Sequence, residues 1–407
     1  MKETKNLIKL FLQEEYAFRR NILSGKTEYR ALSAEAIQSE VAQTFSPLTR
    51  EDLNSIVLAV EAALPDAKVV SRKVETIIYS RLTPDYDPVR EWLANLPAWD
   101  GMNHVGALLD RIPGLHADQR YWMSIWLRSM VAHWLQVDQL HANEVVPTFI
   151  GAQGCGKSTF CRQLLPEHLR GYFLDHVNLA NKFDKEMALT NNLLVNIDEL
   201  DQVRRSQQAE LKQLLSKSRV NGRPIYGRVQ ADRRRYASFV ATTNNRHPLH
   251  DPTGSRRFLC IEIPAGGLID NLTPIAYEQL YAQLLHELGL NGNGALSNCK
   301  GEVEPTGERY WFTEDEVHSL QRANAPYQST LDLERIIDDC FRQPAADEPC
   351  TPLPMTTIVD LVARQYPFIQ PVHATKVQLG MALSTLGFKM ERGEFARRYY
   401  AIPRNVA

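Results

Sequence analysis

The stretch PTFIGAQGCGKSTF, Pro147 to Phe160, decides the fold expected for this chain. An apolar run comes first, a loop rich in glycine follows it, and Lys157, Ser158 and Thr159 come last. The spacing Gly-x-x-x-x-Gly-Lys-Ser is typical of a loop that joins a strand to a helix and binds phosphate. Glycines let main-chain N–H groups turn toward phosphate oxygens, where a Cβ would be in the way.

The whole loop is predicted to bind ATP, and the alternative is a glycine turn that only joins a strand to a helix. Lys157 is expected to reach the β- and γ-phosphates, and the Ser158 hydroxyl to ligate Mg²⁺. The helix that begins near Ser158 would direct its positive end at the same anion. Cys155 has no base beside it, so we interpret it as a tolerated loop residue rather than a nucleophile. The residues assigned to ATP are Gly151, Ala152, Gln153, Gly154, Cys155, Gly156, Lys157, Ser158 and Thr159.

A second apolar run, NLLVNIDEL, ends in Asp198 and Glu199. At the carboxyl end of a strand beside the phosphate loop, Asp198 is expected to be the second Mg²⁺ contact. Glu199 is expected to be the base that polarises the attacking water. A solvated strand end is the alternative. A kinase does not need a glutamate here, so the pair favours ATP hydrolysis over transfer to a metabolite.

A third apolar run, YASFVATTNN, ends at Thr243 and Asn244. We assign Asn244, rather than Asn245, to orient the attacking water; a simple turn asparagine is the alternative. The segment DPTGSRRFLCIEIP then supplies Arg256 and Arg257 before a strand. At a subunit edge, one of them could act as an arginine finger on a neighbouring γ-phosphate, worth ~10³–10⁵ in rate. Two solvated arginines are the alternative.

The segment KSRVNGRPIYGRVQADRRRYA lies between the second and third runs. Its alternation of apolar and basic residues predicts a hairpin with a tip at residues 230–233 that points arginines at a DNA backbone. A solvated charged face is the alternative. The arginines assigned to DNA are Arg228, Arg233, Arg234 and Arg235.

Short apolar runs alternate with helical patterns between about residues 141 and 265, which predicts an α/β core with a mostly parallel sheet. Thr49 is the expected N-cap of a helix in a mostly helical N-terminal region. At the other end, two helical patterns and a hairpin resemble a winged helix that would place Lys376 and Arg397 near DNA, or else contact protein. The expected parts are a helical region at 1–84, a helical lead-in at 85–140, the P-loop ATPase core at 141–290, a linker at 291–325 and a winged-helix-like domain at 326–407.

Composition limits the class of protein. Among 407 residues, 44% are hydrophobic and 23% are charged, as in soluble globular proteins. The net charge of −2 excludes an overall basic coat, so a nucleic-acid site must be local. The six cysteines form no C-x-x-C pair, and no signal peptide or membrane span is recognisable. We therefore expect a cytoplasmic protein with reduced thiols.

The motifs FIGAQGCGKSTF, NIDELDQV, RPIYGR, VATTNN and DPTGSRRFLCIEIP, in this order, resemble the virulence-associated protein E family. Upstream, DPVREWLANLPAWDG is similar to the Trp-Asp-Gly segment that this family carries before its ATPase core. The resemblance covers about residues 85–265. The family is related to superfamily 3 helicases, which are AAA+-type motors of phages, plasmids and mobile islands.

The resemblance implies that Gly151 to Ser158 bind ATP, Asp198 and Glu199 form the second motif, Asn244 is the sensor, and Arg256 or Arg257 is the finger. It implies a ring-shaped hexamer with the hairpins in its channel. The expected function is a replicative DNA helicase on single-stranded or forked DNA, with priming left to a separate chain because the N-terminal region is too short for a primase domain. The alternatives are an ATP-gated initiator or loader that does not unwind DNA, and a small-molecule kinase in which the two arginines act in cis.

Overall fold

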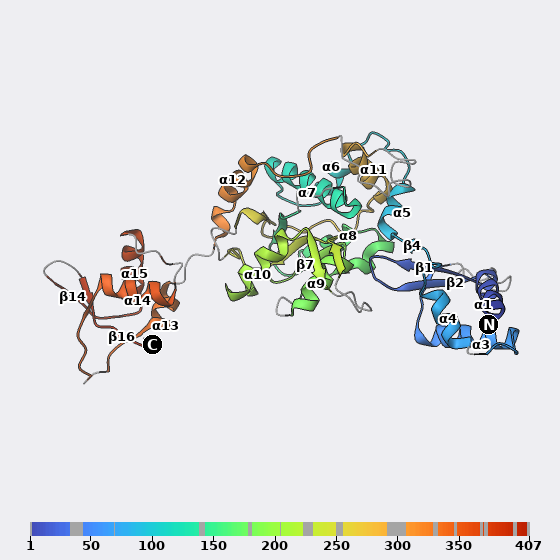
Figure 1. Ribbon diagram of the computed structural model, residues 1–407. Helices are drawn as coiled ribbons and strands as arrows, with labels where there is room; N and C mark the ends of the chain where they lie inside the picture. The colour runs from blue at the N-terminus through green and yellow to red at the C-terminus, as the bar shows by residue number, and fades with distance from the viewer. Residues whose placement is uncertain are drawn as a thin grey trace. The chain divides into compact units, whose positions relative to one another are not determined.

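A computed structural model gives the fold as two compact units, Met1–Gln328 and Ser329–Ala407 (Figure 1). Among the described residues, no helix combines the length and the apolar character needed to cross a membrane. The finer division into five parts stays a prediction. The structure describes residues 2–32, 44–68, 70–137, 143–177, 181–203, 205–222, 231–249, 255–290, 307–328, 333–345, 348–366, 369, 373–393 and 397–404.

The centre of the first unit is a five-stranded sheet in which every pairing is parallel. The strand order is β11-β5-β10-β7-β6. Continuous apolar runs form these strands because helices cover both faces, as in parallel sheets generally. The predicted α/β core with a parallel sheet is confirmed. The strands are β5 (Val146–Ile150), β6 (Phe173–Leu174), β7 (Leu194–Ile197), β10 (Ser238–Thr243) and β11 (Phe258–Glu262).

Neighbouring residues on each strand enter opposite hydrophobic clusters, since side chains alternate across a strand. Phe149 and Val240 pack in one cluster with α7, α8 and α11, whereas Ile150 and Phe239 pack in the other with α9 and α10. Figure 1 shows α7 and α11 on one side of the sheet and α9 and α10 on the other. The helices of this core are α5 (Pro88–Ala94), α6 (His104–Leu109), α7 (Ala117–Leu135), α8 (Lys157–Gln163), α9 (Lys182–Asn191), α10 (Arg205–Ser216), α11 (Tyr277–Glu287) and α12 (Glu314–Ala323).

The N-terminal region contains a sheet as well as helices, so the expectation of a mostly helical region needs correction. Four strands in the order β3-β2-β1-β4 pack beside three helices. The hairpin turns through Gly25, whose φ of +70° favours glycine. Thr49 is the N-cap of α3, as predicted, and forms a capping box with Asp52. The elements are α1 (Lys2–Glu15), β1 (Tyr16–Asn21), β2 (Thr27–Ala31), β3 (Ser46–Pro47), α3 (Arg50–Ala63), α4 (Val70–Ile78) and β4 (Asp85–Tyr86).

The second unit has the arrangement expected of a winged helix. Three helices surround one apolar cluster, and an antiparallel sheet in the order β13-β15-β14 completes the unit. Arg397 is exposed on β15, and Lys376 is half-buried on α15. The elements are α13 (Leu333–Cys340), β12 (Phe341–Arg342), β13 (Leu353–Pro354), α14 (Met355–Gln365), α15 (His373–Thr385), β14 (Met390–Arg392), β15 (Arg397–Tyr399) and β16 (Ile402–Pro403).

The helix α7 is buried along most of its length and carries His133 into the core. The Nε2 atom of His133 has no hydrogen-bond partner among the described residues. Burial, with a smaller contribution from the charge of Arg235, lowers the pKa of His133 to about 3. The imidazole is therefore neutral in the folded protein at pH values well above 3.

We predict that His133 makes the first unit less stable as the pH falls from about 6.5 toward 3, because only the unfolded chain then takes up a proton there. His133→Leu should remove about 2 kcal/mol of the loss in unfolding free energy between pH 7 and pH 5. Urea unfolding followed by tryptophan fluorescence at the two pH values measures this. His318→Gln, on the exposed side of α12, controls for the loss of a histidine as such. An unchanged pH dependence in His133→Leu would contradict the prediction.

Candidate functional site

The phosphate loop leaves β5 at Gly151 and enters α8 at Lys157. Gly154 and Gly156 have φ angles of +82° and +90°, which L side chains rarely adopt. A Cβ on Gly156 would also stand 2.4 Å from Nδ2 of Asn271. Glycine is therefore required here for two separate reasons. The loop residues that face solvent are Ala152, Gln153, Gly154, Ser158 and Thr159.

Lys157 is the residue on which this site converges, and its side chain is buried. The Nζ atom donates to the carbonyl oxygens of Gly151 at 2.8 Å and Ala152 at 2.9 Å. It also donates to Oδ1 of Asn244 at 3.0 Å. The structure thus brings the predicted sensor asparagine to the predicted phosphate-binding lysine. A phosphate oxygen is a stronger acceptor than these neutral oxygens and could replace them.

The carboxylates follow β7, on the other side of β10 from the phosphate loop. Asp198 is exposed, and its Oδ1 accepts a hydrogen bond from Oγ1 of Thr242 at 2.6 Å. Glu199 is exposed in the left-handed region, with φ +52°. Only one other non-glycine residue in the described part of the chain, Gln136, has a positive φ. Strain of this kind costs about 1–3 kcal/mol and is concentrated at functional sites.

Two further acids lie at the same edge of the sheet, and the sequence analysis missed both. Asp201 accepts from Oγ1 of Thr243 at 2.5 Å. Asp175 follows β6 and accepts from Nδ2 of Asn196 at 3.4 Å. The third acid of IDELD and the paired threonines of VATTNN were the available signals. The threonine hydroxyls at the end of β10 therefore position carboxylates that follow β7.

The segment 264–273, which we call the loop strap, holds the phosphate loop from the β11 side. The N–H of Ile269 donates to the carbonyl of Cys155 at 3.0 Å, and Nδ2 of Asn271 donates to the carbonyl of Gly156 at 3.0 Å. Cys155 is buried, with its Sγ 3.6 Å from Nζ of Lys157. No sequence motif marked Asn271, because it is distant from the phosphate loop in sequence and contacts it only in the folded protein.

The two arginines after the glycine turn have different surroundings. Arg257 donates to Oγ of Ser216 at 3.2 Å, and its Nε lies 3.6 Å from a carboxylate oxygen of Glu144. Its side chain is 13% exposed, so it is held within its own chain. Arg256 is exposed on a short 3-10 helix, Ser255–Arg257. Of the two, Arg256 is the one whose side chain is exposed.

The predicted hairpin is present, but its predicted tip is wrong. β8 (Arg219–Gly222) pairs antiparallel with β9 (Ala231–Arg234), and Gly222 stands opposite Ala231. Residues 231–233 therefore belong to the returning strand rather than to the turn. Residue 230 of the predicted tip and Arg228 lie outside the described residues. Ala231, Asp232 and Arg233 were expected in the turn, yet they stand opposite Gly222, Asn221 and Val220 of β8.

The assignment of Arg235 to DNA is also wrong. This side chain is 1% exposed, and its nitrogens donate to four backbone carbonyl oxygens inside the protein. A guanidinium held in this way cannot contact a DNA backbone. Arg233 is partly buried and donates to Oδ1 of Asn191 at 3.2 Å. Arg234 stands opposite Arg219 in the hairpin register.

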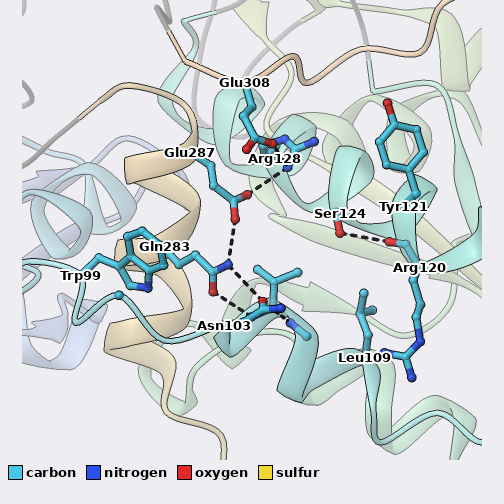
Figure 2. Close-up of a pocket in the computed structure, with 13 residues that line it drawn as sticks. Trp99, Asn103, Leu109, Arg120, Tyr121, Ser124, Arg128, Gln283, Glu287 and Glu308 are labelled. Atoms are coloured by element: carbon cyan, nitrogen blue, oxygen red, sulfur yellow. Dashed lines mark hydrogen bonds and ion pairs between the residues drawn. The ribbon is translucent and has the colours of Figure 1, made fainter. Parts of the chain in front are cut away.

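A cavity of about 490 Å³ lies apart from these residues, between the Trp99–Gly101 turn, α6, α7 and α11 (Figure 2). None of the predicted site residues lines it. Figure 2 shows Gln283 donating to Glu287, and Glu287 accepting from Arg128. The N–H of Val105 donates to Gln283. These bonds fasten α6 and α7 to α11. The N–H of Asp100 also donates to Oε1 of Gln279 on α11, so the Trp-Asp-Gly segment is part of the scaffold beside the core.

The residues predicted to hold Mg²⁺ fit that ion. Ser158 and Asp198 are both exposed, and both offer oxygen ligands. Mg²⁺ is usually bound through one or two carboxylates, with waters and phosphate oxygens completing its shell. No group of three or more His, Cys, Asp or Glu side chains in the described part of the chain is arranged to hold a metal ion.

The comparisons with known proteins agree with the resemblance in the motifs. The family model for the virulence-associated protein E-like domain matches residues 93–327, more than half of the chain. This chain belongs to that family. The matched residues include the phosphate loop, both carboxylates of β7, the hairpin, Asn244 and the loop strap.

Similar solved structures include apo forms of the C-terminal region of NrS-1. One is 12% identical, with a TM-score of 0.44, and the match covers 98% of this chain and 99% of that one. Another is 13% identical, with a TM-score of 0.45 and 99% of each chain covered. No curated protein matches the chain.

We predict that Gly156→Ala destabilises the first unit by about 1–3 kcal/mol, since alanine is strained at this φ and its methyl group meets Asn271. Urea unfolding measures the loss. Adding Asn271→Ala should relieve the contact but leave the backbone strain and remove the hydrogen bond to the Gly156 carbonyl, so the double variant recovers at most part of the stability. Gly171→Ala is the matched control, because a Cβ there meets nothing within 4 Å. Equal effects at Gly156 and Gly171 would refute the assignment of strain to the loop.

Proposed function

We propose that this chain is an ATP-hydrolysing DNA motor, a superfamily 3-type replicative helicase that acts as a ring on single-stranded DNA. One observation carries the proposal: Nζ of Lys157 lies 3.0 Å from Oδ1 of Asn244, at the sheet edge where Glu199 follows the next strand. A cation for phosphate, an amide for water and a carboxylate for its proton thereby follow three neighbouring strands of the sheet. These groups are the ones that cleavage of a γ-phosphate by water requires.

Each residue has a defined task in this proposal. Lys157 leaves the loop carbonyls for the β- and γ-phosphates, while Ser158 and Asp198 supply oxygen ligands to Mg²⁺. Bound Mg²⁺ neutralises charge that develops on the phosphate oxygens. Asn244 orients a water, and Glu199 accepts its proton from an exposed position. Thr242 fixes Asp198 through a hydrogen bond, which keeps the metal ligand apart from the base.

The hairpin supports DNA as the partner. Arg219 and Arg234 stand directly opposite each other in its register, so the hairpin carries two basic residues at one level of the strand pair. Basic residues on such a hairpin suit a polyanion such as the DNA backbone. The hairpin leads directly into β10, which ends at Asn244, so the polynucleotide and the nucleotide would act on one strand.

The second candidate is an ATP-gated initiator or loader that grips DNA without separating its strands. It is favoured by the winged-helix unit, where Val377 and Met381 are exposed one turn apart on α15. Such a face suits contacts with a protein or with base edges rather than with phosphates. Unwinding of a forked duplex distinguishes the two functions, because the initiator hydrolyses ATP and leaves the fork intact. The exposed Glu199 disfavours the small-molecule kinase. It would activate water, and that water would compete with a metabolite for the γ-phosphate.

We predict that Glu199→Gln lowers the rate of ATP hydrolysis by about 10²–10⁴-fold while ATP affinity stays within a few-fold, because the base is lost and the phosphate ligands are kept. Single-turnover hydrolysis and a binding titration with a fluorescent ATP analogue measure the two quantities. Lys157→Ala should instead lose binding. Asp201→Asn tests the nearest rival base, and a larger rate loss there than in Glu199→Gln would transfer the role to Asp201.

We predict that Arg256 acts in trans. Arg256→Ala and Glu199→Gln should each be inactive alone, and mixing them should restore partial hydrolysis. In a mixed assembly, a subunit with Glu199 can receive Arg256 from its neighbour. ATP turnover measured across mixing ratios checks this. The control is a mixture of Arg257→Ala with Glu199→Gln, since Arg257 is held by its own chain. Failure of every ratio to exceed the unmixed variants would place Arg256 in cis or outside the site.

A further inference from the structure

Arg235 is a buried cation bonded to backbone carbonyls. Its Nε donates to the carbonyl of Ala237 at 2.6 Å, and its Nη2 to that of Asn143 at 3.1 Å. Its Nη1 donates to the carbonyls of Leu215 at 2.5 Å and Lys217 at 3.0 Å. The guanidinium carbon lies 5.1 Å from the ring centroid of Phe239. Removal of a charge from water is costly, so a cation so fully enclosed needs a role that an apolar residue could not fill.

The four carbonyls belong to the segments that carry the site. Leu215 and Lys217 lie at the carboxyl end of α10, the helix that follows the carboxylates of β7. Ala237 directly precedes β10, which ends at the sensor Asn244. Asn143 lies just before β5, which ends at the phosphate loop. Arg235 itself directly follows β9, the returning strand of the hairpin.

A second bond joins two of these segments independently. Nδ2 of Asn143 donates to Oγ of Ser238 at 2.9 Å, which fastens the start of β10 to the segment before β5. The root of the hairpin is therefore held where three elements of the site meet. A lysine could not make the same contacts, because its single ammonium lacks the planar fork of five donors that reaches four carbonyls at once.

We propose that Arg235 is a positioning residue that couples the hairpin to the nucleotide crevice, so that shifts of β10, α10 and the β5 lead-in on ATP binding move β8 and β9 as one rigid body. The inference rests on the proposed function, which assigns ATP to that crevice. An element that shifts between two positions transmits binding energy only when the nucleotide crevice and the hairpin are both attached to it. Arg235 is the fastening at the hairpin end.

Hydrogen exchange in the full chain tests the proposal. The exchange of backbone amides in 219–222 and 231–234 is compared with and without ATPγS and Mg²⁺, alongside a binding titration with a fluorescent ATP analogue. In the wild type we expect ATPγS to change hairpin exchange by about fivefold or more. Arg235→Lys should abolish that change while nucleotide affinity stays within a few-fold. Stimulation of ATP turnover by single-stranded DNA should fall by a similar factor.

Arg128→Lys is the matched control, since Arg128 is a buried arginine that donates to the carbonyl of Arg309 and to the carboxylates of Glu287 and Glu308, none of which belongs to the hairpin. Arg128→Lys should lower the stability of the protein and leave the ATPγS-induced change in hairpin exchange intact. Phe239→Leu is a second variant that loosens Arg235 without leaving carbonyls unpaired, and it should weaken the response in part. A full wild-type response in whichever of the Arg235 and Phe239 variants folds would overturn the proposal, as would an equal loss in Arg128→Lys.

The titration separates the two possible failures. If the wild type binds no ATP analogue, the proposed function fails, and the coupling falls with it. If the wild type binds the analogue and hairpin exchange does not respond, the proposed function stands and the coupling alone is refuted.

Discussion

The position of β10 between β5 and β7 is the constraint on which the site depends. All three strands run parallel, so their carboxyl ends meet at one edge of the sheet, where open α/β sheets bind ligands. From β10, Asn244 meets Lys157 of the phosphate loop, and Thr242 meets Asp198 beyond β7. A strand inserted elsewhere in the sheet would separate the lysine from the amide, and the carboxylate from its hydroxyl partner.

The same strand connects this edge of the sheet to the hairpin. Its first residue accepts a bond from Asn143, and the residue before it accepts one from Arg235. Its last residue, Thr243, holds Asp201. One element thus has the hairpin root at its start and the proposed catalytic groups at its end. Three features of this region are locally unfavourable: the buried arginine, the strained Glu199 and the glycines with positive φ. The surrounding packed core keeps them in place.

Local chemistry explains why much of the site could be predicted. Gly154 and Gly156 are required by backbone angles that only glycine adopts readily, so the loop is recognisable in any chain that carries it. Asp198 and Asn244 follow short apolar runs, which are typical of buried strands in a parallel sheet. Asp201 and Asn271 escaped prediction because each acquires its contact from an element distant in sequence. The N-terminal sheet escaped because its short strands are only partly buried and show little apolar alternation.

The sequence by itself determined the phosphate loop, the order of strands and helices in the core, and the family, because these depend on spacing within one segment at a time. Only the tertiary structure decided which strands are neighbours, that Arg235 lies inside rather than on DNA, and that Arg256 is exposed while Arg257 is held. The physical reason is that the sequence shows an arginine as the same charged residue whether it lies in the protein interior or at the surface. Whether it faces carbonyls or solvent is set by the elements packed around it, which no short motif encodes.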